Sequence, residues 1–149
     1  MTTAQQHLNQ FLKKYSPEME KLGHRAIKLL RKRLPGAICL VYDNYNALAV
    51  GLGPDAKAST VPISIAFYPR WATLFFLYGA LLPDPDGLLE GKGARVRSIR
   101  LKGLETLSDP AVDRLIGAAV LQAGWKLAPK AKGELIIKSV SPKQRPRRP

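Results

Sequence analysis

The stretch that most constrains the fold is residues 61–68, in which side chains alternate strictly between two faces. One face carries Val61, Ile63, Ile65 and Phe67, and the other carries Pro62, Ser64, Ala66 and Tyr68. A period of two with one apolar face is typical of an antiparallel strand that buries a single side. The rest of the chain must therefore supply further strands and a layer that covers the apolar face.

The segment before this strand predicts a hairpin. Residues 37–42 and 47–52 are short apolar runs separated by Asp43-Asn44-Tyr45-Asn46. Asp and Asn bond to nearby backbone and tolerate left-handed dihedral angles, so they favour a turn at this point.

The segments after it predict more of the same sheet. Residues 71–78 are apolar on both faces, which indicates a strand deep in the sheet, and residues 96–101 predict a fifth strand. A bulge near Ser98 is needed to bring the apolar side chains of that fifth strand to one face. Residues 134–140 are compatible with an additional edge strand.

Helices are predicted at both ends of the chain. Residues 4–15 place apolar side chains at helical spacing, and a second helix begins at Ser16-Pro17-Glu18, where serine caps and proline occupies the first turn. That helix ends at Leu34-Pro35-Gly36, because proline cannot continue it. A last helix begins at Asp109-Pro110 and ends near Gly124.

This order of elements predicts an α+β fold: a two-layer structure with an about five-stranded, mostly antiparallel sheet, covered on one face by N-terminal and C-terminal helices. The length of 149 residues fits one domain. We expect an N-terminal helix at 1–15, an α/β domain at 16–125 and a basic extension at 126–149. The end of that extension, SPKQRPRRP, has almost no apolar content and is predicted to be disordered.

The composition indicates a cytoplasmic protein. No apolar run is long enough for a membrane span, and the N-terminus lacks the charge and apolar order of a secretory signal. A single cysteine, Cys39, is what a reducing compartment favours.

The formal net charge of +13 favours a polyanionic partner such as nucleic acid. Sixteen of the 24 Lys and Arg residues lie in residues 1–34 and 126–149. The candidate contacts lie on the second helix, in the loop Gly91-Lys92-Gly93 and in the C-terminal extension. They are Lys21, Arg25, Lys28, Lys32, Lys92, Arg145, Arg147 and Arg148. The alternative is that these charges form an ordinary solvated surface and serve solubility.

The turn segment is also a candidate ligand site. Asp43 either accepts hydrogen bonds from the turn's own amides or belongs to a site at one rim of the sheet. Aromatic faces beside a guanidinium suit a planar or anionic ligand. The residues of this candidate site are Tyr42, Asp43, Tyr45, Asn46, Tyr68, Arg70 and Trp71. An uncovered face with Tyr68 or Trp71 also permits pairing with a second copy of the chain.

No motif predicts catalysis, a metal or a cofactor. Gly51-Leu52-Gly53-Pro54-Asp55-Ala56 has dinucleotide-type glycine spacing, but Pro54 and the polar segment after it do not open a helix there. Cys39 lies in an apolar strand, where a thiol is inert, and no cluster of His, Cys and acidic residues is visible. We therefore expect no catalytic residues.

Taken together, these stretches resemble the YdhG-like domain family, a bacterial group of unknown function. The match covers roughly residues 16–125. It is carried by the helix ending in Leu34-Pro35-Gly36, the strand at 37–42, Ile63-Ser64-Ile65-Ala66-Phe67-Tyr68-Pro69, Gly91-Lys92-Gly93 and the helix from Asp109-Pro110. The resemblance implies a small two-layer α/β domain.

The chain is similar to a divergent branch of that family. The most familiar branch has a Gly-Met-Pro-x-Phe-type segment where this chain has Asp43-Asn44-Tyr45-Asn46. Some relatives are described as frataxin-like intracellular iron chaperones. Iron carriers of that kind rely on acidic surfaces, because hard cations prefer carboxylate oxygens, and this basic chain matches no iron-ligand motif.

The sequence thus predicts a small cytoplasmic, non-enzymatic domain that binds a planar or anionic small molecule, or a protein, at the sheet rim. The alternative is a nucleic-acid-associated protein that acts through the stripe of basic side chains on the second helix and through the C-terminal tail.

Overall fold

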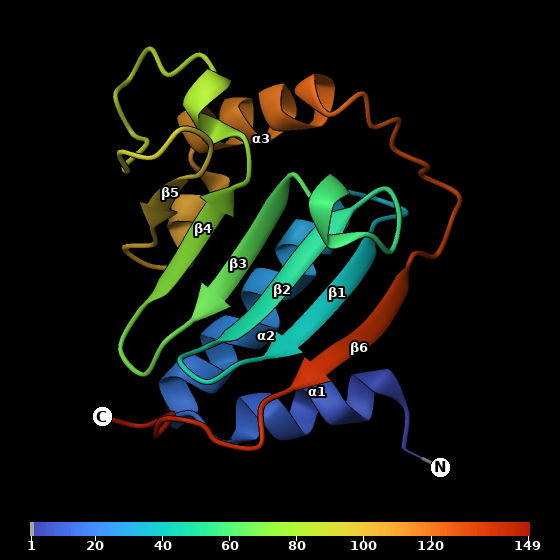
Figure 1. Cartoon of the computed structure of the whole chain (residues 1–149), viewed down its shortest axis with the longest axis vertical. Helices are drawn as coiled ribbons and strands as arrows, with labels where there is room; N and C mark the ends of the chain where they lie inside the picture. The colour runs from blue at the N-terminus through green and yellow to red at the C-terminus, as the bar shows by residue number, and fades with distance from the viewer. Residues whose placement is uncertain (1) are drawn as a thin grey trace.

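The computed structural model describes residues 2–149, which form three α-helices and one six-stranded sheet (Figure 1). The helices are α1 (Ala4–Lys13), α2 (Pro17–Arg33) and α3 (Pro110–Gln122). The strands are β1 (Ile38–Asp43), β2 (Leu48–Gly53), β3 (Ile63–Phe67), β4 (Ala72–Phe76), β5 (Arg97–Arg100) and β6 (Glu134–Val140).

The sheet has the order β5-β4-β3-β2-β1-β6, and every neighbouring pair is antiparallel except β1 and β6. The predicted α+β class and mostly antiparallel sheet are confirmed, but there are six strands rather than about five. The additional strand is β6, which the sequence allows as an edge strand. The chain leaves α3 at one end of the sheet and crosses to lie beside β1, which makes this pair parallel (Figure 1).

The predicted bulge near Ser98 is wrong. β4 and β5 pair in unbroken register from Thr73↔Arg100 to Phe76↔Arg97. Val96 precedes the strand and is 43% exposed, so no bulge is needed to bring it to the apolar face. The irregularity in the sheet lies instead between Val41 and Tyr42, where β1 pairs with β6.

The predicted helix boundaries are confirmed by the capping residues. The Ser16 hydroxyl accepts a hydrogen bond from the Met19 amide, and the Asp109 carboxylate accepts one from the Ala111 amide, each followed by proline in the first turn. Gly124 has a φ of +64° just after α3, a conformation that glycine adopts without strain.

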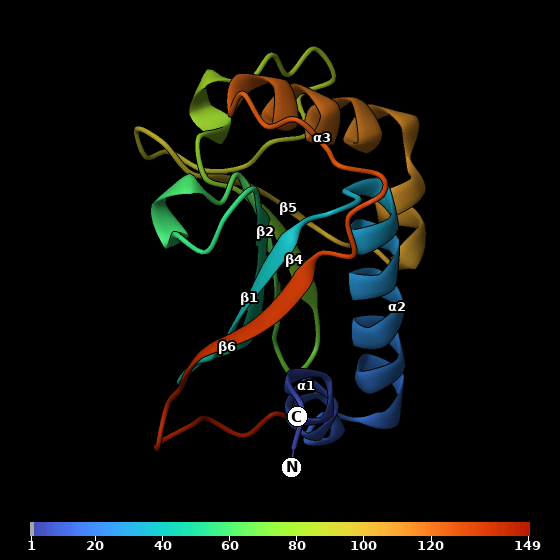
Figure 2. The ribbon, with the colours of Figure 1, turned by 90° about the vertical axis from the view of Figure 1, so that its right-hand side faces the viewer.

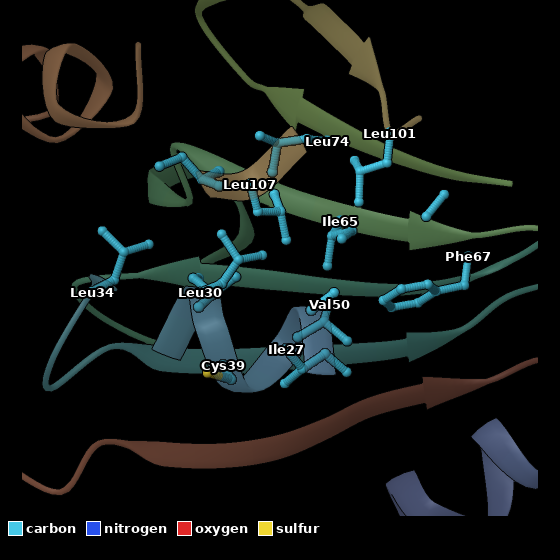
Figure 3. Packing of buried hydrophobic residues seen from close by; sticks show 14 of the residues in the cluster. Ile27, Leu30, Leu34, Cys39, Val50, Ile65, Phe67, Leu74, Leu101 and Leu107 are labelled. Carbon is cyan, nitrogen blue, oxygen red and sulfur yellow. The ribbon is translucent and has the colours of Figure 1, made fainter. Parts of the chain in front are cut away.

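The core lies between α2 and one face of the sheet (Figures 2 and 3). Ile27 and Leu30 of α2 belong to the same buried cluster as Val50, Ile65 and Leu74 from the central strands (Figure 3). Burying one such side chain contributes about 1.5–3 kcal/mol. α1 and α3 lie at opposite ends of the sheet (Figure 2).

The other face of the sheet, turned away from α2, is called the open face. In Figure 2 it is approached by the loop 54–62 with its short 3-10 helix, Ala58–Thr60. Residues paired directly across antiparallel strands share a face, so the register assigns the members of the open face. From β1 to β5 these include Tyr42, Ala49, Gly51, Ser64, Ala66, Thr73, Phe75, Ser98 and Arg100.

Residues 141–149, the C-terminal tail, differ from the disordered segment that their composition predicts. The tail turns back after β6 and runs beside the β1–β2 turn and the end of α1, so that both chain ends lie near α1 (Figures 1 and 2). It has few apolar residues to bury, and specific polar contacts hold it instead.

Candidate functional site

Asp43, the centre of the predicted site, is the last residue of β1 and is fully buried on the side of the sheet that faces the core. Two cations contact its carboxylate: Lys14 Nζ lies 2.6 Å from Oδ2, and Arg147 Nη2 lies 2.9 Å from Oδ1. Gln144 Nε2 donates to Oδ2 at 2.9 Å. These four residues form the Asp43 cluster.

The C-terminal tail supplies two members of this cluster and also extends the backbone pairing of the turn. The amide of Ser141 donates to the Asp43 carbonyl, and the amide of Arg145 donates to the Tyr45 carbonyl, both at 2.8 Å. Arg147 is only 4% exposed and also donates to the carbonyl oxygens of Asn44 and Tyr45.

The electrostatics of the cluster favour a charged Asp43. Burial alone raises the pKa of this carboxyl group, but hydrogen bonds from Lys14, Gln144 and Arg147 outweigh it and hold the pKa below its usual value. A buried carboxylate whose two oxygens both accept hydrogen bonds from cations has a structural role.

Tyr15 joins the end of α1 to the sheet beside this cluster. Its buried hydroxyl donates to the Phe67 carbonyl at 2.6 Å and accepts from the Leu48 amide at 3.1 Å. Burial raises the pKa of Tyr15 to about 12. The Arg147 guanidinium carbon lies 5.9 Å from the centre of the Tyr15 ring, which adds a cation–π contact to the tail.

The candidate rim site is therefore divided between the two faces of the sheet. Asp43 accepts hydrogen bonds from side chains distant in sequence and points to the core face. Tyr42, its neighbour, points to the open face, while Tyr45 and Asn46 are exposed in the turn between β1 and β2. Lys14, Tyr15 and Gln144 were missed, because no local pattern connects them to Asp43.

Tyr68 and Trp71 come together on the open face, and Arg100 joins them. The rings of Tyr68 and Trp71 stack with centroids 5.2 Å apart and planes inclined by 23°. The guanidinium carbon of Arg100 lies 4.3 Å from the centre of the Trp71 ring. Tyr68 follows β3, Trp71 precedes β4 and Arg100 belongs to β5, so the three side chains lie across three neighbouring strands. We call these three residues the stacking row.

Sequence reasoning did not single out Arg100, although a signal for it exists. Ser98 and Arg100 alternate with the buried Ile99 and with Leu101, which predicts that both polar residues share the outward face of their strand. The strand order, which no local pattern gives, was needed to place Arg100 beside Trp71.

A shallow cavity of about 290 Å³ lies on the same open face, farther along the strands, and no residue of the stacking row lines it. Its lining is mainly apolar, with the hydroxyl-bearing side chains of Tyr42 and Ser64 among its walls. The lining residues are Tyr42, Ala49, Gly51, Ala58, Val61, Ser64, Phe75, Leu77 and Val96.

The glycines that fit dinucleotide spacing have a packing role at this cavity. A Cβ on Gly51 would lie 2.9 Å from Val61 Cγ1, and one on Gly53 would lie 3.2 Å from Val61 Cα. Both glycines are in β2, and their missing side chains let the loop 54–62 approach the open face closely.

The basic candidates occupy several separate places. Lys21, Arg25, Lys28 and Lys32 are exposed on α2, on the side of the molecule away from the open face (Figure 2). Lys92 is exposed in the loop before β5, Arg70 is exposed beside Trp71, and Arg145 is exposed in the tail. Arg148 is exposed too, but its Nε donates to the Lys14 carbonyl, while Arg147 is engaged with Asp43.

Cys39 is buried on the core face of β1, and burial raises the pKa of its thiol. In residues 2–149, no group of three or more His, Cys, Asp or Glu side chains is arranged to hold a metal ion. None of the helices in the described part of the chain combines the length and apolar composition that a membrane crossing needs.

Comparison of the chain with protein-family models, with curated proteins and with solved structures finds no match.

Proposed function

We propose that this chain is a binding domain whose open face takes up a planar, negatively charged ligand. The observation that carries the proposal is the stacking row of Tyr68, Trp71 and Arg100, on the same open face as a cavity of about 290 Å³ lined in part by Tyr42. The proposed site retains four residues of the predicted site, Tyr42, Tyr68, Arg70 and Trp71, and adds Arg100. Asp43 has a structural role instead.

The chemistry of these side chains supports a ligand of this class. Aromatic faces bind flat rings by stacking, and a guanidinium pairs with a carboxylate or phosphate through two parallel hydrogen bonds. The cavity is near the lower end of the range for small-molecule sites, about 300–1,000 Å³. It is large enough for one ring system, whose acidic substituent would point toward Arg100, one cross-strand pair away from Phe75 of the lining.

We propose binding rather than catalysis, because two groups with potential reactivity, Asp43 and Cys39, are engaged elsewhere. The Asp43 carboxylate is paired with Lys14 and Arg147, and the Cys39 thiol is buried in the core with a raised pKa. We place this function in the cytoplasm, since a lone cysteine is typical of reducing compartments. Membership of a divergent, bacterial YdhG-like branch remains part of the proposal, supported by the sequence resemblance.

The test uses Trp71 as its own reporter. The chain has two tryptophans, so a Trp125→Phe variant leaves Trp71 as the single indole. Adenosine 5′-monophosphate should quench its fluorescence with saturation, whereas ribose 5-phosphate, which has the charge without the ring, should not.

Two variants in that background locate the site. Arg100→Gln should weaken binding of adenosine 5′-monophosphate about tenfold, as expected for loss of a charge-assisted contact. Arg25→Gln removes another exposed arginine, on α2, and should leave the affinity unchanged. Equal effects of the two substitutions, or absence of saturable quenching, would contradict the proposal.

A further inference from the structure

We infer that the ligand of the open face is single-stranded nucleic acid, with bases stacked at the row of Tyr68, Trp71 and Arg100 and phosphates held by the surrounding cations. This inference rests on the proposed function and names the ligand class. The nucleic-acid contact is then expected on the open face of the sheet, and not on the basic side chains of α2 or the C-terminal tail.

The register gives this face room for more than one base. Tyr42, Ala49, Ala66, Thr73 and Arg100 form one line across β1 to β5. Strands lie about 4.8 Å apart, so this line is about 19 Å long. Its middle positions, Ala49 and Ala66, have small side chains, and Ala66 and Thr73 are only 5% and 8% exposed, so a base between Tyr42 and the stacking row would rest on the side chains that cover them. Open antiparallel sheets that present aromatic side chains in this way can stack two or three bases.

The charge of the open face suits a polyanion. The members of this face on β1 to β5 include the exposed Arg100 and, within the described residues, no Asp or Glu, while pairing brings Glu90 (with Ser98) and Glu134 (with Ile38) to its two edges. Lys138 extends from the edge strand β6 to the Ala56 carbonyl of the loop over this face, at 3.4 Å. The one acidic residue of that loop, Asp55, is occupied by the Thr60 hydroxyl and the Lys57 amide.

Single strands fit this surface better than duplexes do. Stacking on Tyr68 or Trp71 needs an exposed base face, which a duplex hides between its own base pairs. A mononucleotide contacts one ring and places one phosphate, whereas a strand also extends toward Tyr42 and reaches further cations beside this face, Arg70 and Lys138.

The test measures the anisotropy of fluorescein-labelled decathymidylate with the full-length chain at 50 and 200 mM salt. With about three phosphates neutralised, the slope of log affinity against log salt should be about −2, a loss of about 15-fold over this range. Unlabelled decathymidylate should compete at least tenfold better than thymidine 5′-monophosphate, and better than a ten-base-pair duplex.

Matched variants decide which surface binds. Tyr68→Leu and Arg100→Gln should each weaken decathymidylate binding about tenfold, whereas Arg25→Gln on α2 and Arg145→Gln in the tail should change it less than twofold. Circular dichroism and melting curves show whether each variant keeps the fold. If Tyr68→Leu fails to fold, Arg100→Gln alone decides the test, because the Arg100 side chain is exposed and its replacement should leave the fold intact.

The outcomes separate this inference from the proposed function. Thymidine 5′-monophosphate binding as tightly as the decamer would overturn the inference and leave the proposed function standing. Decamer binding that depends on Arg25 or Arg145 but not on Arg100, or equal affinity for duplex, would also overturn the inference. Failure of both mononucleotides and oligonucleotides to bind would overturn both.

Discussion

The guanidinium of Arg147 lies 2.9 Å from the carboxylate of Asp43, which joins residues 104 positions apart in the chain. Both side chains are almost completely buried, at 2% and 0% exposure. The pair fixes the C-terminal tail against the β1–β2 turn, so that the most basic and proline-rich part of the sequence is part of the folded structure.

Removal of Arg147 should destabilise the protein. Arg147→Ala leaves a buried carboxylate with Lys14 and Gln144 only, so we expect the free energy of unfolding to fall by about 2–3 kcal/mol, somewhat less than for a fully isolated buried charge. Urea unfolding at neutral pH measures this difference. Arg145→Ala in the same tail, whose side chain is exposed, should cost less than about 0.5 kcal/mol; similar losses for the two variants would contradict the role of the ion pair.

Stability should depend on pH through Asp43. Its pKa is lower in the folded chain than in the unfolded one, so its contribution is complete above the usual carboxyl pKa near 4 and is lost as pH falls below that value. The difference in unfolding free energy between the natural chain and Asp43→Asn should therefore be constant from about pH 6 to 8 and shrink toward about pH 3.

The control for that experiment is Asp113→Asn. Asp113 pairs with Arg33 at 2.6 Å, but it is half-exposed and its ion pair is screened by water. We expect this substitution to change stability little at any pH. A difference for Asp43→Asn that stays the same down to about pH 3 would show that its carboxylate is not stabilised by the cluster.

Tyr15→Phe tests the junction between α1 and the sheet. The substitution leaves the Phe67 carbonyl and the Leu48 amide buried without their partner, at a cost of about 1–3 kcal/mol. Because the pKa of Tyr15 is raised to about 12, its contribution is complete below about pH 10 and is lost as pH rises toward 12. Tyr45→Phe, at an exposed position, should show neither effect.

Gly51→Ala tests the close approach of the loop 54–62 to the open face. The new methyl group would lie 2.9 Å from Val61 Cγ1, so the Val61 side chain or the loop that carries it must shift, with a loss of about 1 kcal/mol from overpacking. The double variant Gly51→Ala/Val61→Ala removes the clash, so it should lose less stability than the two single variants together. Strict additivity of the two losses, measured by thermal unfolding, would contradict the packing role of this glycine.

Much of the fold was predictable because its signals are local. The alternation at 61–68, the caps at Ser16 and Asp109, and the turn after Asp43 each specify an element through a few neighbouring residues. β6 was harder to place, because its pairing depends on a parallel crossover that follows α3, and the position of a crossover is not a local property.

The candidate site was only partly predictable for the same reason. Alternation along β1 separates Tyr42 from Asp43, but local sequence patterns do not show that Lys14 and Arg147 contact the carboxylate. Low apolar content predicts disorder for the tail, yet a few specific ion pairs and backbone hydrogen bonds replace the missing apolar burial.

The most direct test of the account is a map of amide chemical-shift changes on titration with adenosine 5′-monophosphate. We predict that the largest changes fall on the open face, at Tyr42, Ala49, Ser64, Ala66, Phe75 and Arg100, and at Tyr68 and Trp71 beside them. Largest changes along α2 at Lys21, Arg25, Lys28 and Lys32, or no saturable change anywhere, would contradict it.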